Sequence, residues 1–287
     1  MKQHRAVLPA ALILCATAAY GQDRSELLAA VDAPADMIAA NVDAAGMATI
    51  VEIDHSRLAE DVGVPMPPSR VILFSDPAIE APILAENIRA GLDLPMRALA
   101  YWQDEGPALK YTGSDFLAAR HGLTDAAALA GLDGALASAL AGVDAVSTPV
   151  EGLALDYGII EFNSPFDLAE SVERLKAAVM SQDDTVWFGE VDFTAEAASV
   201  GVDLPPSRLL LFGGPGPGGV AMADFPSIGL DAFCQKLLIY EDGTGAVRVL
   251  FNGIAALAEL HYGASAEPHA QLDARLTQTF RGALGLD

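Results

Sequence analysis

An internal repeat is the feature that most constrains the fold of this chain. Residues 63–77 and 201–215 are identical at nine of fifteen aligned positions, where chance composition predicts about one. The same offset of 138 residues aligns the Gly-Leu-Asp sequence at 91–93 with the one at 229–231. Self-similarity at a fixed spacing indicates that one structural unit is used twice. We therefore predict two copies of one domain.

Each copy has mixed α and β patterns, which are clearest in the second copy. Residues 157–163 are rich in Ile, Phe and Tyr and predict a strand, and Ser164 and Pro165 predict the start of a helix that runs to Ser181. Further strands are predicted at 185–191, 208–212, 237–241 and 246–251, and short helices before residue 201 and at 255–262. The fold class is therefore α+β: two tandem two-layer α/β sandwich domains, each with a mainly antiparallel sheet covered by helices.

The repeat also predicts the domain boundaries. The first domain covers residues 22–150 with a trailing Ala-rich helix at 126–146, and the second covers 151–287 with a C-terminal helix at 271–284. The segment 126–146 is the one later stretch that resembles a membrane span, but Asp133 and Asp144 interrupt it. A central Asp costs roughly 2.5–3.5 kcal/mol on insertion scales. We expect a soluble helix and no stable membrane insertion of the mature chain.

The first 21 residues have the order of a secretory signal peptide. Basic residues precede an apolar stretch at 6–19, and the small residues Ala19 and Gly21 lie at the positions that signal peptidase requires before a cut after Gly21. We therefore expect a periplasmic protein. Lipidation of Cys15 is the alternative, although Leu14 occupies a position that usually holds a small residue in lipoprotein signals.

The charge of the chain excludes two classes of partner. It has 39 acidic and 16 basic residues, a formal net charge of −23. Nucleic-acid binding needs clustered Lys and Arg, and an anionic membrane surface repels such a chain. Cleavage of the leader would leave Cys234 as the single cysteine, so no intrachain disulfide is expected.

Several motifs together resemble the bacterial domain-of-unknown-function family 302. They are the Glu-Ile-Asp-His sequence at 52–55, the stretch at 204–215, Gly-Leu-Asp-Leu-Pro-Met-Arg at 91–97 and Arg-His-Gly at 120–122. The resemblance covers nearly all of the mature chain as two copies. It implies the two-layer α/β fold and, because members often dimerise, an internal pseudo-dimer. It implies no established reaction, cofactor or catalytic residue.

The two copies differ in their polar residues. Copy two has Phe193 in place of His55 and Gln235 in place of Arg97, whereas copy one keeps the polar residues of the family pattern. A polar site is therefore expected in copy one only. The candidate ligand-binding residues are His55, Arg97, Tyr111, Arg120 and His121.

Each candidate also has a structural interpretation. His55 is either a ligand-binding or proton-transferring imidazole, or a residue near the start of the following helix. Arg97 and Arg120 either clamp an anion or form surface ion pairs with acidic residues. His121 and His261 lie at helix ends, where a cationic ring interacts favourably with the helix dipole.

No catalytic or metal site is predicted. The glycine-rich stretch at 213–219 lacks the Lys-Ser/Thr of a phosphate-binding loop, and its two prolines remove N–H donors, so we predict a turn there. Cys234 is expected to be a buried structural thiol, and the histidines lack zinc-ligand spacing. We therefore predict no cofactor.

The sequence favours a non-enzymatic exported module that binds a small ligand or ion and is built from two repeated domains. Its partner would be an unknown small molecule or an envelope protein. One alternative is a cell-envelope protein–protein interaction module, and the other is a hydrolase or redox enzyme that uses His55 and His121.

Overall fold

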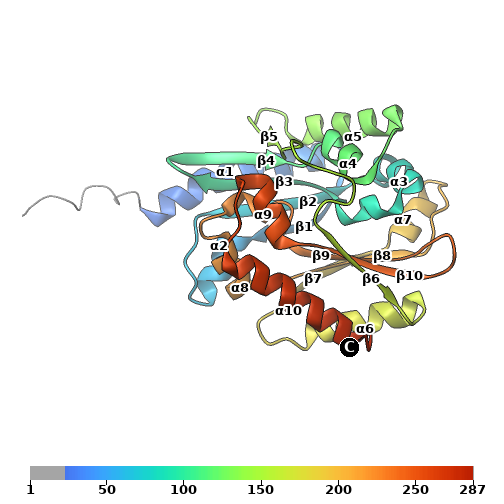
Figure 1. The fold of residues 1–287 in the computed structure, drawn as a ribbon. Helices are drawn as coiled ribbons and strands as arrows, with labels where there is room; N and C mark the ends of the chain where they lie inside the picture. Colours follow the sequence, from blue (N-terminus) through green and yellow to red (C-terminus); the bar gives the residue numbers. More distant parts are fainter. Residues whose placement is uncertain (1–22, 287) are drawn as a thin grey trace, which may run out of the picture.

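Two five-stranded sheets, one from each copy, form the frame of the protein in the computed structural model, which describes residues 23–286 (Figure 1). The sheet orders are β1-β2-β3-β4-β5 and β6-β10-β9-β8-β7, and every pair of neighbours is antiparallel except β4 and β5. The predicted fold class, α+β in two repeated units with mostly antiparallel sheets, is confirmed.

Apart from one edge strand in each sheet, the elements follow the same order in both copies. Copy one contains α1 (Arg24–Ala44), β1 (Ala48–Asp54), α2 (His55–Asp61), β2 (Ser69–Ser75), α3 (Pro77–Glu86), η1 (Ile88–Leu92), β3 (Met96–Gln103), β4 (Gly106–Tyr111), α4 (Ser114–His121), α5 (Ala126–Ala139) and β5 (Val146–Ser147). Copy two contains β6 (Ile159–Ser164), α6 (Leu168–Met180), β7 (Val186–Val191), α7 (Phe193–Ser199), β8 (Ser207–Gly213), α8 (Pro215–Met222), η2 (Pro226–Gly229), β9 (Gln235–Glu241), β10 (Val247–Asn252), α9 (Ile254–Tyr262) and α10 (Glu267–Ala283).

Repeated residues produce repeated local structure. Asp54 and Asp192 are the N-cap residues of α2 and α7, and each carboxylate accepts a hydrogen bond from the backbone N–H three residues later. Such a bond satisfies one of the free N–H groups at a helix start. The ladders β1–β2 and β7–β8 also carry an irregularity at equivalent positions.

One edge of the sheet is built differently in the two copies. In copy two, β6 precedes α6 and pairs antiparallel with β10. In copy one, β5 follows α5 and pairs parallel with β4. Strand β5, in the segment that links the copies, thus lies at the edge of the first sheet beside β4. Strand β6 has the equivalent edge position beside β10 in the second sheet.

Both faces of the second sheet are buried. Leu210 and Phe212 belong to a core with the helix residue Phe280, whereas Leu209 and Leu211 share a core with residues of copy one. Successive strand residues point to opposite faces. One face is therefore covered by α6 and α10 and the other faces the first sheet, as Figure 1 shows.

Helices of the two copies pack in a reciprocal arrangement. Helix α2 packs on α8, and α3 packs on α7. Because α2 corresponds to α7 in the repeat, and α3 to α8, the two contacts are equivalent. The same pair of corresponding helices thus meets twice in the molecule.

Three helix boundaries differ from the sequence prediction. The C-terminal helix predicted at 271–284 begins earlier, at Glu267. Helix α6 begins at Leu168 with Asp167 as its N-cap, because Ser164 is still paired with β10. The helix predicted at 126–146 ends at Ala139, and Val146 begins β5.

The glycine-rich stretch, predicted to be a turn, is mostly helix α8. Pro215 lies at its first turn, where a missing N–H costs little. A side chain at Gly219 would place its Cβ 2.7 Å from the Cβ of Ala59 on α2. Glycine there permits the close approach of α8 to α2.

Within residues 23–286, the structure contains no helix with the length and apolarity that a membrane crossing requires. The predicted signal peptide, its cleavage after Gly21 and the alternative at Cys15 lie outside the described residues.

Candidate functional site

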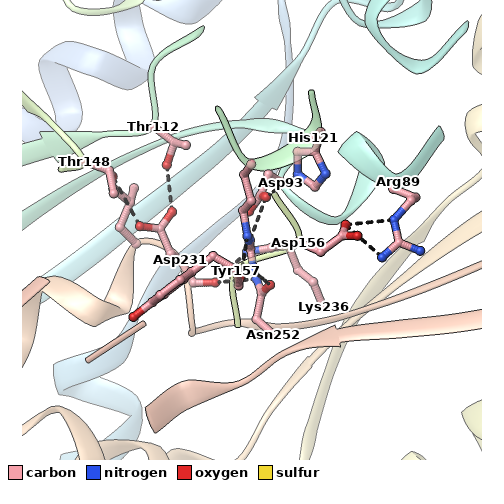
Figure 2. A network of polar contacts seen from close by, with 12 residues as sticks. Arg89, Asp93, Thr112, His121, Thr148, Asp156, Tyr157, Asp231, Lys236 and Asn252 are labelled. Carbon is pink, nitrogen blue, oxygen red and sulfur yellow. Dashed lines mark hydrogen bonds and ion pairs between the residues drawn. The ribbon is translucent and has the colours of Figure 1, made fainter. Parts of the chain in front are cut away.

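Buried polar side chains gather between the two sheets (Figure 2). We call seven of them the central cluster. Each side chain belongs to a residue at most 4 % exposed, and the seven are Asp93, Arg97, Arg120, His121, Asp231, Lys236 and Asn252.

The repeat places the two carboxylates of the cluster. Asp93 directly follows η1, and Asp231 lies at the equivalent position after η2. Arg97 on β3 and Lys236 on β9 come a few residues later. Lys236 points to the same face as Leu238, which belongs to the core shared with copy one.

Arg97 joins the two copies. Its Nη2 donates to Asp93 Oδ1 at 3.0 Å and to Asp231 Oδ1 at 2.5 Å. Its Nε donates to the carbonyl oxygen of Leu230 at 3.0 Å, and Nη1 donates to the carbonyl oxygen of Asp93. One guanidinium from copy one is therefore held by carboxylates of both copies.

Arg120 and His121 complete the surroundings of Asp93. Arg120 donates through Nη1 to Asp93 Oδ2 at 2.7 Å and through Nη2 to Asn252 Oδ1 of copy two at 2.8 Å. His121 Nε2 lies 2.7 Å from Asp93 Oδ2, so this nitrogen carries a proton toward the carboxylate. The other ring nitrogen, Nδ1, is buried without a hydrogen-bond partner among the described residues.

Copy two repeats the His–Asp pair with different neighbours. His261 Nε2 lies 2.7 Å from Asp231 Oδ2. Thr112 and Thr148, both outside copy two, also donate to this carboxylate, at 2.7 Å and 3.2 Å (Figure 2). Leu260 aligns with Arg120, so the second pair lacks an arginine of its own.

Charge in this closed space controls the protonation of its members. Burial alone would raise the pKa of Asp93, but Arg120, His121 and Arg97 outweigh it and hold that pKa well below its ordinary value. Asp231 behaves in the same way beside Arg97 and His261, and its pKa is lowered. Burial, together with the positive charge of Arg97, lowers the pKa of Lys236 from 10.5 to about 8. Both carboxylates are thus ionised, and Lys236 is mostly protonated at neutral pH.

The structure brings three of the five predicted ligand-binding residues together. Arg97, Arg120 and His121 converge on Asp93. Tyr111 instead lines a surface groove of about 530 Å³ beside α5, and His55 Nε2 contacts the carbonyl oxygen of Gly229 at 3.3 Å. The arginines do pair with acidic residues, but in the interior and not at the surface, because the second copy covers them.

Sequence reasoning missed four members of the cluster, Asp93, Asp231, Lys236 and Asn252. Asp93 and Asp231 are the aspartates of the repeated Gly-Leu-Asp sequence, so their recurrence was a usable signal. Lys236 had no such signal, since its burial depends on how the second sheet faces the first.

Two further predictions concern metals and the thiol. Within residues 23–286, no group of three or more His, Cys, Asp and Glu side chains is arranged to hold a metal ion. Cys234 is buried and free, as expected, and burial raises the pKa of its thiol.

Comparison with known proteins identifies the family. The family model described as "Domain of unknown function DUF302" matches residues 25–139 and again 160–281. The chain is 39% identical over 107 residues to Fluoride-specific ion channel FluC 1 of Brucella suis biovar 1 (strain 1330), which is 37% of this chain and 41% of that protein. It is equally similar to FluC 1 of Brucella abortus biovar 1 (strain 9-941), of which it covers 39%. It thus spans about two fifths of the length of these relatives.

A solved structure is also similar to part of the chain. The crystal structure of an uncharacterized conserved DUF302 protein from Bacillus stearothermophilus matches with a TM-score of 0.36 and 16% identity, and the match covers 44% of this chain and 98% of that one. The two family matches together cover most of the sequence. The chain therefore belongs to the DUF302 family and contains two copies of its domain in tandem.

Proposed function

We propose that this protein is an exported, non-enzymatic module that binds one small anion in the central cluster, between two copies that form an internal pseudo-dimer. The observation that carries the proposal is an excess of positive charge. Among the described residues, the cluster holds three positive side chains, Arg97, Arg120 and Lys236, but only two carboxylates, those of Asp93 and Asp231.

Buried charge is expensive unless it is balanced. An isolated ion in a protein interior costs several kcal/mol, and such groups pair with an opposite charge or lose their own. The two arginines already form ion pairs with the two aspartates. Lys236 is left with a single neutral acceptor, the carbonyl oxygen of Asp231 at 3.1 Å. A bound monoanion would make the cluster neutral and supply the ammonium group with an acceptor.

The free nitrogen of His121 supports the same proposal. Because Nε2 directs its proton at Asp93, Nδ1 is the ring atom left without a partner among the described residues. A buried polar atom without a partner is a place where an unseen water or ion is expected. The side chains around it are shielded from solvent, so the ligand would be a small ion.

Fluoride is the first anion to test. The relatives that match part of this chain carry the name fluoride-specific ion channel. Only the chemistry of the ligand is taken from that name. Fluoride is the smallest halide and accepts strong hydrogen bonds from ammonium and guanidinium groups, which the cluster contains.

Export, the pseudo-dimer and the absence of catalysis are parts of the same proposal. Export is supported by the order of basic, apolar and small residues at positions 1–21, and the pseudo-dimer by the reciprocal packing of α2 on α8 and α3 on α7. The alternative enzyme would need His55 and His121 to act together. The two rings are held by different partners, Gly229 and Asp93.

The test is anion binding by the purified full chain. Thermal unfolding is followed in sodium fluoride, chloride and formate at constant ionic strength, and fluoride binding is followed by 19F NMR. We expect one ion per chain and a concentration-dependent rise in Tm that Lys236→Met abolishes.

Lys176→Met is the matched control, because Lys176 is a half-exposed lysine that pairs with Glu190. It should bind fluoride as the unmodified chain does. Any other bound ligand would appear as extra mass in native mass spectrometry that is lost after denaturation. If no small anion raises Tm, or if Lys236→Met binds as well as the unmodified chain, the anion-binding proposal is wrong. Envelope proteins that co-purify would then favour the interaction module.

A further inference from the structure

A pocket of copy two lies on the face of the second sheet that points away from the central cluster. We call it the Gln235 pocket, after the residue of β9 that lines it together with residues of α8 and α10. Gln235 and Lys236 are successive strand residues, so their side chains point to opposite faces. The pocket has a volume of about 40 Å³, roughly the space of three water molecules.

Gln235 is a buried polar group of this pocket that no described residue satisfies. The residue is 6 % exposed, and its side-chain amide forms no hydrogen bond with the rest of the described chain. An amide has one acceptor and two donors to satisfy. Because burial of such a group without partners costs free energy, a buried amide that faces a cavity marks a place where a bound molecule is expected.

Aromatic rings surround the amide. Phe212 lies directly opposite Gln235 in the β8–β9 ladder, so the two side chains are neighbours on one face of the sheet. The Phe212 ring contacts Phe280 of α10 edge to face, with ring centres 5.9 Å apart. Phe233 forms a further wall, because a Cβ atom on Gly218 would lie 3.3 Å from its ring. The amide therefore lies on the floor of a mainly apolar pocket.

The charged residues that line the pocket neutralise each other at its mouth. Arg275 of α10 donates to both carboxylate oxygens of Asp184 at 2.6 Å and to Gln182 Oε1 at 3.0 Å. The side chains of Arg275 and Asp184 are 41 % and 43 % exposed, and no other charged residue of the described chain lines the pocket. A charged ligand would lose its hydration here without a counter-charge. The pocket therefore favours a neutral ligand.

The repeat supplies an internal comparison for the floor. Phe74 pairs with Met96 in copy one as Phe212 pairs with Gln235 in copy two. The strands therefore align Gln235 with Met96, whereas the sequence comparison aligns it with Arg97, one residue away. The fold accepts a side chain without hydrogen-bond donors at this position, so packing alone does not call for an amide.

A second difference between the copies concerns the wall. Helices α3 and α8 both begin with proline, so Pro217 corresponds to Ile79. Ile79 reaches the trailing helix of copy one, because its Cδ1 lies 3.6 Å from the Cβ position of Gly131 on α5. The Pro217 ring is shorter and cannot extend as far toward α10. Copy two thus combines a smaller wall residue with a polar floor.

We propose that the Gln235 pocket binds a small neutral primary amide with a short branched alkyl group. The ligand carboxamide pairs with the Gln235 amide through one N–H···O hydrogen bond in each direction, a match on two sides that a hydroxyl or a ketone does not offer. The alkyl group contacts the rings of Phe212, Phe233 and Phe280. Three waters occupy roughly 90 Å³ of liquid, which a molecule of about five or six non-hydrogen atoms fills.

The proposal does not depend on anion binding, because the central cluster contributes none of these contacts. Its test is a titration of the full chain with isobutyramide. The side-chain NH₂ signals of Gln235 in a 1H–15N spectrum are identified by their loss in Gln235→Met. We expect these signals to shift and to saturate with a Kd on the order of 1 mM, as suits so small a ligand. Isobutyramidinium has the same shape with a positive charge and should not bind.

Two variants test the floor and the wall separately, with binding followed by saturation transfer to the methyl groups of isobutyramide. Gln235→Met removes the hydrogen bonds and should weaken binding about tenfold. Pro217→Ile fills the pocket and should weaken binding at least as much. Both variants copy residues that the fold accepts in copy one, Met96 and Ile79, so far-UV circular dichroism should match that of the unmodified chain.

Gln278→Met is the binding control, because Gln278 is exposed on α10, and it should leave the affinity for isobutyramide unchanged. Three results would each overturn the proposal. They are Gln235 signals that do not shift with isobutyramide, equal affinity in Gln235→Met and the unmodified chain, and binding of isobutyramidinium as tight as that of the amide.

Discussion

Single buried ionisable residues determine how this protein responds to pH. Lys236 and Glu80 are both enclosed, and burial shifts their pKa values in opposite directions. Each is disfavoured in its charged form by the folded state. The two residues therefore predict opposite changes of stability with pH.

Lys236→Met should stabilise the protein at pH 7. The pKa of Lys236 is lowered from 10.5 to about 8, so between those values the unfolded chain binds more protons than the folded one, and stability rises with pH. The penalty is fully present below pH 8. At about 1.4 kcal/mol for each pKa unit, this penalty is on the order of 3 kcal/mol. The variant loses the hydrogen bond of Lys236, which offsets about 1 kcal/mol of the gain in stability.

Urea unfolding at pH 7 and pH 10.5 measures this effect in buffers without small anions. The variant should be the more stable protein at pH 7 and lose its advantage near pH 10.5. A difference that stays constant with pH would show that the charge of Lys236 costs nothing.

Glu80→Gln should stabilise the protein at alkaline pH and leave its stability nearly unchanged at acidic pH. Burial raises the pKa of Glu80 from 4.5 to about 8, so between these values the folded chain binds more protons and stability falls as pH rises. Glutamine keeps an acceptor for the Met96 N–H and has no charge to bury. Urea unfolding should give similar stabilities near pH 5 and a gain on the order of 4 kcal/mol for the variant at pH 9. A variant that is less stable at both pH values would contradict this account.

Sequence comparison of the copies found part of the central cluster. Arg97, Arg120 and His121 were singled out because copy two lacks the matching arginines, and they do converge on one carboxylate. Tyr111 and His55 were grouped with them, but Tyr111 lines a surface groove and His55 is buried against Gly229. What the sequence could not provide is the partner across the copies: Asp231 reaches Arg97 only because the sheets face each other.

At the scale of elements, the helix that follows each copy closes its core. Helix α5 packs on α1, α3 and α4, and α10 packs on the corresponding helices α6, α8 and α9. Phe280 on α10 makes edge-to-face contacts with Phe212 and Phe251, with ring centres 5.9 Å and 5.3 Å apart. Both rings belong to strands of the second sheet.

Phe280→Ala should therefore destabilise the protein strongly. A buried Phe replaced by Ala costs about 3–5 kcal/mol through lost transfer energy and a cavity. Gln278→Ala on the exposed side of the same helix should change stability by less than about 0.5 kcal/mol. Chemical denaturation with a tryptophan fluorescence readout compares them. Equal losses in the two variants would mean that α10 does not anchor the core through Phe280.

Element boundaries show where local sequence rules stop. The second-copy strands and the hairpin were predicted within a few residues, since alternation and turn residues are local signals. The start of α6 was missed because Ser164 and Asp167 are both good N-cap residues, and strand pairing with β10 decides between them. The glycines of α8 suggested a loop, whereas their small size serves packing on α2.

For the whole molecule, charge is divided between a slightly positive interior and an acidic surface. Among the described residues, the buried acids are Glu80, Asp93 and Asp231, and the buried bases are Arg97, Arg120 and Lys236. Their formal charges cancel, so the formal excess of 23 negative charges belongs to the rest of the chain. Because burial raises the pKa of Glu80 to about 8, the interior is slightly positive at pH 7. Like charges on a surface repel one another and disfavour the compact state.

Screening should therefore raise the stability of the whole protein. Between about 10 and 150 mM salt the Debye length falls from roughly 30 Å to 8 Å, and we expect Tm to rise by about 3 °C, which corresponds to roughly 1 kcal/mol for a chain of this size. The salt must be sodium gluconate, whose anion is too large for the central cluster, so that screening is measured apart from anion binding. Lys236→Met should respond to gluconate as the unmodified chain does, because its change lies inside the protein. A Tm that is flat in gluconate but rises in fluoride would assign the effect of salt to the cluster and contradict the surface-repulsion account.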